Sequence, residues 1–128
     1  MKIERETAEG RNVFTAYGEG WVEVNGARHH ANLVVGATLL VPGWTCGGLE
    51  AVSAAELEAL LAPGPEIVLL GTGDAFRFPD PARLAPLHRA RIGVEVMDTR
   101  AACRTYNILL SEGRKVLAAL IVEPGSRA

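Results

Sequence analysis

The sequence has few cysteines, few aromatic residues and no surplus of positive charge. Its 128 residues include two cysteines and 5% aromatic residues, and 13 lysines and arginines are set against 15 aspartates and glutamates, for a net charge of -2. A protein that binds duplex nucleic acid normally carries clustered positive charge, so we expect no nucleic acid partner. Cys46 and Cys103 could form one disulfide, but a chain with this much aliphatic sequence does not need it, and a reducing cytoplasmic location is expected.

Long apolar segments are also missing. The longest apolar run, residues 116–122, is far shorter than the roughly 20 residues that span a bilayer, so no transmembrane segment is predicted. The first ten residues alternate charges without an apolar core, which is typical of neither a secretory signal nor a transit peptide. We expect residues 1–10 and 123–128 to be flexible tails around a core of about residues 12–122.

What the sequence contains is the balance of an ordinary soluble globular protein. Hydrophobic residues make up 48% and charged residues 22% of the chain. A chain of this length is about one domain long and can bury a single core without disulfides or metals. Residues 1–128 are therefore expected to form one domain.

Short extended runs in the first third predict a β layer. Asn25-Gly26 separates two of these runs, and this pair favours a type I′ hairpin turn because both of its residues tolerate positive φ. Gly36 is expected to form a bulge or bend between the last two strands. The strands are expected at residues 12–17, 21–24, 27–30, 32–35 and 37–41.

Helices and strands alternate in the rest of the chain. Ser53 and Glu56 have the spacing of a capping box, which predicts a short helix. Residues 66–70 then form an apolar run, typical of a central strand that is covered on both faces. Asp80-Pro81 predicts the start of a helix to about residue 91, with Pro86 separating or kinking its first turn.

A strand at residues 94–98, a helix at about residues 100–112 capped by Thr99, and a last strand at residues 115–122 complete the predicted order. This order predicts an α/β fold: a small layered single domain, with an N-terminal β-hairpin layer and a central mixed or parallel sheet flanked by helices. One helical crossover joins the strands that end at residues 70 and 98. Their carboxyl ends should therefore open at the same edge, where ligands usually bind in open α/β sheets.

Polar residues gather at this predicted edge. The amides at the start of the last helix, together with Arg100 or Arg104, could hold a carboxylate or phosphate. The structural alternative is that Thr99 caps the helix and Asp98 complements its dipole, which requires no ligand. The candidate ligand- or partner-binding residues are Gly71, Thr72, Gly73, Asp74, Asp98, Thr99, Arg100, Arg104 and Asn107.

Complete catalytic and cofactor motifs are missing. Gly71-Thr72-Gly73 lacks the third glycine of a dinucleotide fingerprint, since Phe76 stands in its place, and a tight strand exit explains these glycines equally well. Cys103 lies near a helix start, but a buried core cysteine is the commoner case. No Walker phosphate loop, Gly-x-Ser-x-Gly elbow or Cys/His metal spacing occurs, so we predict no cofactor, no metal and no catalytic residues.

Three segments resemble the Mth938-like family, formerly a domain of unknown function. They are residues 67–73 (IVLLGTG), 93–99 (GVEVMDT) and especially 101–107 (AACRTYN), and the resemblance covers about residues 14–121. It implies a small three-layer α/β domain. It also implies a relation to a mitochondrial assembly factor for respiratory complex I and to a member linked to adipocyte differentiation, neither with an accepted catalytic reaction.

The resemblance and the missing catalytic motifs favour a non-catalytic assembly or interaction protein. Its expected partners are proteins, in particular respiratory complex subunits or assembly factors, bound at the edge formed by residues 71–74 and 98–107. The alternative is a small anionic-metabolite-binding protein or enzyme that uses the same edge, with Cys103 or Asp98 contributing chemistry. A third hypothesis is that this edge is the self-interface of a homo-oligomer.

Overall fold

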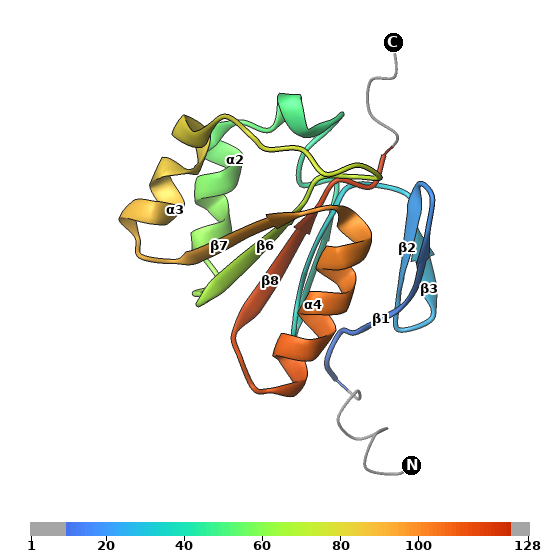
Figure 1. Cartoon of the computed structure of the whole chain (residues 1–128). Helices are drawn as coiled ribbons and strands as arrows, with labels where there is room; N and C mark the ends of the chain where they lie inside the picture. The colour runs from blue at the N-terminus through green and yellow to red at the C-terminus, as the bar shows by residue number, and fades with distance from the viewer. Residues whose placement is uncertain (1–9, 124–128) are drawn as a thin grey trace.

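Two β-sheets and the helices around them make up residues 10–123, the part of the chain that the structure, a computed structural model, describes (Figure 1). The tails predicted at residues 1–10 and 123–128 lie outside this range except for Gly10 and Glu123. The predicted α/β fold with a hairpin layer and a mixed central sheet is confirmed.

The smaller sheet contains three antiparallel strands in chain order. They are β1 (Phe14–Gly18), β2 (Trp21–Val24) and β3 (Ala27–His29). Asn25 and Gly26 connect the last two with φ of 51° and 87°, which confirms the hairpin expected from this pair.

The larger sheet has five strands in the order β5-β4-β8-β6-β7. Its members are β4 (Leu33–Gly36), β5 (Leu39–Pro42), β6 (Ile67–Gly71), β7 (Gly93–Met97) and β8 (Val116–Leu120). β8 lies in the middle, parallel to β6 and antiparallel to β4. The first third of the chain is therefore not one β layer as predicted, because β4 and β5 belong to the central sheet.

Gly36 is not a bulge or bend, in contrast to the prediction. It pairs regularly with Leu39 at the end of β4, and Ala37-Thr38 form the turn. A Cβ atom on Gly36 would lie 2.7 Å from Leu117 Cδ2, so close packing across the sheet explains this glycine.

The helices are short except for the last. They are η1 (Leu49–Ala51), α2 (Ala54–Glu58), η2 (Ala59–Leu61), η3 (Pro81–Leu84), α3 (Ala85–Arg89) and α4 (Thr99–Ser111). The capping box before α2 is present, with Ser53 Oγ accepting from Glu56 N and Glu56 Oε1 accepting from Ser53 N. Pro86 lies in the first turn of α3, and the turn before it is the separate η3, as predicted.

The central sheet has a hydrophobic core on each face. α4 and the smaller sheet cover one face, where Phe14 and Tyr106 pack edge to face with ring centroids 5.1 Å apart. Leu57 of α2 and Leu87 of α3 pack on the other face. These three layers leave the ends of the strands as the regions where loops can form a site (Figure 1).

Candidate functional site

The carboxyl ends of the parallel strands meet at one edge, as the sequence predicts. Gly71 at the end of β6 lies beside Met97 of β7 and Leu120 of β8. The two predicted clusters touch here: Thr99 N donates to Gly73 O at 2.9 Å, and Gly73 N donates to Thr99 Oγ1 at 2.8 Å. We call residues 71–74 and 98–104 the carboxyl edge.

Thr99 connects the ends of these strands rather than capping α4. Its hydroxyl donates to Ile121 O at 2.8 Å while accepting from Gly73 N, and its side chain is buried. The cap is Asp98, whose Oδ1 accepts from Ala101 N at 2.9 Å. The predicted cap is therefore wrong by one residue: Asp98 caps α4, and the Thr99 hydroxyl is already bonded on both sides within the protein.

The glycines of the edge are explained by packing. A Cβ atom on Gly71 would lie 2.8 Å from Leu120 Cδ2 and 2.9 Å from Thr99 Oγ1. Gly73 has a φ of +105°, which side chains rarely allow. The tight strand exit, rather than a phosphate-binding turn, accounts for both glycines.

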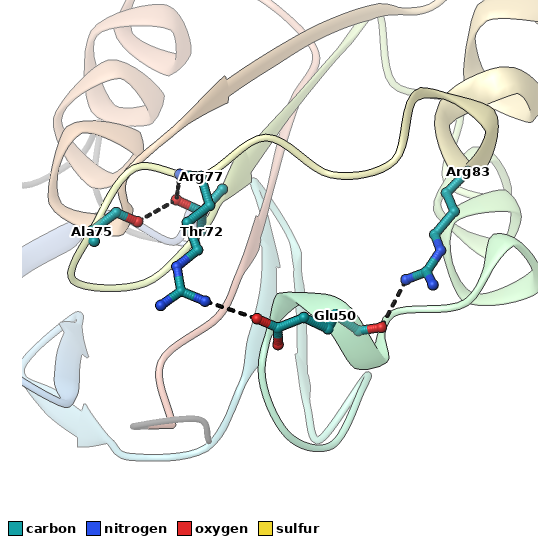
Figure 2. Close-up of polar contacts among 5 residues, drawn as sticks. All are labelled: Glu50, Thr72, Ala75, Arg77 and Arg83. Carbon is teal, nitrogen blue, oxygen red and sulfur yellow. Dashed lines mark hydrogen bonds and ion pairs between the residues drawn. The ribbon is translucent and has the colours of Figure 1, made fainter. Parts of the chain in front are cut away.

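Thr72 stabilises the loop that follows β6 by two hydrogen bonds. Its hydroxyl donates to Ala75 O at 2.7 Å and accepts from Arg77 N at 3.2 Å (Figure 2). Arg77 Nη1 in turn pairs with Glu50 Oε2 at 2.7 Å, and Arg83 Nη1 donates to the Glu50 carbonyl at 2.8 Å. The loop of residues 74–80, which we call the Phe loop, is thus tied to η1 by side chains within it and after it.

Two exposed aromatic rings lie on the Phe loop. Phe76 is 58% and Phe78 is 72% exposed, and their ring centroids are 5.7 Å apart. Neither was a candidate in the sequence analysis. The signal available in the sequence was two phenylalanines, two residues apart, in a segment predicted to be a loop.

The remaining candidate binding residues do not converge on one site. Asp74 and Arg100 are exposed at the carboxyl edge. Arg104 Nη1 donates to the Tyr17 hydroxyl at 2.9 Å, and this hydrogen bond raises the pKa of the guanidinium. Asn107 binds the backbone of Phe14 instead of the edge, donating to its carbonyl at 2.8 Å and accepting from its amide at 3.0 Å. Asn107 is therefore a structural residue.

Cys103 is part of the core, as the commoner case predicts. It is 0% exposed, and burial raises the pKa of its thiol to about 12, so it is protonated at neutral pH and unsuited to nucleophilic attack. Cys46 is exposed, and both cysteines are free thiols. Within residues 10–123, no three His, Cys, Asp or Glu side chains gather as metal ligands would.

The carboxyl edge is a surface rather than a cleft. The cavity between it and the smaller sheet, lined in part by Asp74, Thr99 and Arg100, has a volume of about 10 Å³. That is room for about one water molecule. A larger hollow of about 420 Å³ lies at the opposite end of the central sheet, beside the first residue of β8, Val116.

Comparison with known proteins identifies the family. A family model described as "Protein of unknown function (DUF498/DUF598)" matches residues 14–121, nearly all of the chain that the structure describes. The chain belongs to this family. A relative from Xenopus tropicalis, named NADH dehydrogenase (ubiquinone) 1 alpha subcomplex assembly factor 3, is 34% identical over 94% of this chain and 66% of its own length. The chain thus spans about two thirds of that relative.

Solved structures confirm the Mth938-like fold of this DUF498/DUF598 member. A crystal structure of a Bordetella parapertussis protein matches with a TM-score of 0.80 and 38% identity, covering 89% of this chain and 98% of that chain. An NMR structure of a Bordetella pertussis protein, described as a Mth938-like domain, matches with a TM-score of 0.77 and 31% identity, covering 91% and 89%. In residues 10–123, none of the helices is long and apolar enough to cross a bilayer.

Proposed function

We propose that this protein is a non-catalytic assembly or interaction factor that binds a protein of the respiratory NADH dehydrogenase complex or one of its assembly factors. The proposed binding surface is the carboxyl edge extended by the Phe loop. The observation that carries the proposal is the pair of exposed rings, Phe76 and Phe78, on a loop held by hydrogen bonds at Ala75 and Arg77.

A loop of this kind is suited to protein binding because its apolar side chains are already in place. Exposed aromatic residues are enriched where proteins meet, and a preformed loop loses little conformational freedom on binding. Asp74 and Arg100 lie exposed near the base of the Phe loop, and charges beside an apolar centre supply the polar rim of such a surface. The relationship to an assembly factor supports the choice of partner.

Affinity capture from the source cells tests this proposal. The tagged protein should recover NADH dehydrogenase subunits or assembly factors, and Phe76→Ser/Phe78→Ser should lose them. Leu40→Ser is the matched control, because it removes an exposed apolar side chain from β5. Capture without any respiratory protein, or equal capture by the double variant, would count against the proposal.

The alternative of a small anionic metabolite at the carboxyl edge has less support. The volume there is about 10 Å³, and the hydroxyls of Thr72 and Thr99 are bonded within the protein. A melting screen against anionic metabolites tests it, since a ligand at a hundred times its Kd would stabilise the protein by about 2.7 kcal/mol. Light scattering tests the homo-oligomer hypothesis.

The cytoplasmic location stays a prediction. The two free cysteines, one of them exposed, fit a reducing compartment. Fractionation of the source cells, with detection of the protein in each fraction, provides the test.

A further inference from the structure

Three turns enclose a hollow at the amino ends of β6 and β8. They are the β4–β5 turn with Ala37-Thr38, the turn at residues 63–65 before β6, and the turn at residues 113–115 between α4 and β8. The hollow has a volume of about 420 Å³. Small-molecule sites usually have about 300–1,000 Å³, so this hollow is large enough for a small ligand.

Residues with small or rigid side chains keep this space open. Gly64 and Gly113 have φ of +76° and +84°, and nothing lies within 4 Å of where their Cβ atoms would be. A Cβ atom on Gly36 would lie 2.7 Å from Leu117 Cδ2, so the chain packs closely beside the hollow at this glycine. The floor is apolar, because Leu110 and Leu117 line it and are buried.

The rim of the hollow is positively charged. Arg11, Arg114 and Lys115 line it, and none of the described lining residues is acidic. Arg11 is fixed by a 2.8 Å hydrogen bond from Nη2 to Leu110 O at the end of α4. Arg114 Nε pairs with Glu66 Oε1 at 2.9 Å, which lowers the pKa of that carboxyl group. The two terminal nitrogens of Arg114 remain as further donors.

The positive charge of the rim is opposite in sign to the net charge of the whole chain, which is -2. Of the three cations that line the rim, Arg114 is paired with a carboxylate, that of Glu66, which lies outside the lining. An apolar floor beneath a cationic rim matches a molecule with an apolar body and one negative head group. A carboxylate suits this rim because it accepts hydrogen bonds from both guanidinium and ammonium groups.

We propose that this hollow binds a small organic acid, with its apolar body against Leu110 and Leu117 and its carboxylate held by Arg11, Arg114 and Lys115. The site is independent of the proposed protein-binding surface. The two lie at opposite ends of the central sheet, so each can be tested without the other.

An NMR titration of the ¹⁵N-labelled protein tests the proposal with sodium hexanoate as the probe. Hexanoate should give saturable shifts of the Gly36, Gly64 and Gly113 amides and leave Gly73 at the carboxyl edge unchanged. Hexan-1-ol lacks the charge and inorganic phosphate lacks the apolar body. Each should bind at least tenfold more weakly than hexanoate.

Charge-removing variants separate this site from adventitious binding. Arg114→Gln/Lys115→Gln should weaken hexanoate binding at least tenfold and leave hexan-1-ol binding unchanged. Lys115→Gln alone, which keeps the Arg114–Glu66 pair, should weaken hexanoate at least threefold. Arg100→Gln at the carboxyl edge is the control and should change neither.

Four results would overturn the proposal: no saturable shift with hexanoate, shifts centred on Gly73, equal binding of hexan-1-ol or phosphate, or unchanged affinity in Lys115→Gln. If the Phe loop captures no protein, the proposal of an organic-acid site is unaffected.

Discussion

Thr99 shows how a polar residue at a helix start can serve the interior of a protein. Its hydroxyl bridges Gly73 N and Ile121 O, which belong to segments that are far apart in the sequence. The sequence analysis named Thr99 as the cap of α4, although Asp98 is of a residue type that caps helices equally well. The choice depends on Ile121, and no local pattern contains that information.

Replacing Thr99 by valine should destabilise the protein by about 1–3 kcal/mol. The buried Ile121 carbonyl and the part-buried Gly73 amide would lose their partner, and that loss exceeds the gain from an added methyl group. Urea unfolding followed by circular dichroism measures the change.

Thr105→Val provides the control on the same helix. Thr105 is half-buried and does not join the strand ends, so we expect a change below about 0.5 kcal/mol. Equal effects of the two substitutions would refute the bridging role of Thr99.

The two cysteines should differ sharply in reactivity. With a pKa of about 12, only about one Cys103 in ten thousand carries a thiolate at pH 8, and its sulfur is buried. A chromogenic disulfide reagent should therefore react rapidly with one equivalent of thiol in the folded protein, with none in Cys46→Ser, and with two in denaturant. Rapid release of two equivalents from the folded protein would contradict the burial of Cys103.

At the scale of the elements, the side chain of Asn107 attaches β1 to α4. Its amide makes the two hydrogen bonds to Phe14 that a neighbouring strand would make. The sequence predicted both elements, but it placed Asn107 at the carboxyl edge because a helix pattern does not say which face meets the smaller sheet.

Asn107→Ala should loosen the smaller sheet and cost about 1–3 kcal/mol, because the part-buried backbone groups of Phe14 lose their partners. Hydrogen exchange should show faster exchange of the Phe14 amide. Ile108→Ala is the matched control: Ile108 is 57% exposed, so its loss should change stability by less than about 0.5 kcal/mol. Unchanged protection of Phe14 in Asn107→Ala would argue against the attachment.

Elements with a local cause could be predicted from the sequence. The Asn25-Gly26 hairpin, the Ser53 capping box and the break before Pro86 each depend on residues within one turn of each other. The placement of β4 and β5 in the central sheet depends on pairing with β8, more than 80 residues later. Alternation in a strand indicates which faces are apolar but not which strand lies alongside.

At the scale of the whole molecule, the two sheets share one core cluster, in which Phe14 and Val22 pack with Leu69 and Leu120. The sequence correctly predicted where the parallel strands end. The sequence analysis placed the ligand site at the carboxyl edge, but hydrogen bonds such as that from Gly73 N to Thr99 Oγ1 hold the segments together there. The larger hollow forms at the other end of the sheet, between turns that are distant in sequence.

A shared core predicts a single unfolding transition. Trp21 lies in the smaller sheet, whereas Trp44 Nε1 donates to Leu120 O of the central sheet at 3.0 Å. In Trp21→Phe and in Trp44→Phe, the remaining tryptophan's fluorescence and the far-ultraviolet circular dichroism should give the same urea midpoint. A lower fluorescence midpoint in Trp44→Phe, where only Trp21 reports, would show that the smaller sheet unfolds separately.

The central position of β8 also affects how the protein is made. During synthesis, the β4–β5 hairpin and the β6–β7 pair leave the ribosome before the strand that joins them, because β8 occupies residues 116–120. Until then each half exposes one apolar strand with unpaired backbone groups, a combination that promotes aggregation. We therefore expect the nascent chain to need chaperones most just before β8 emerges, and a stop before residue 116 would leave two half-sheets that cannot join.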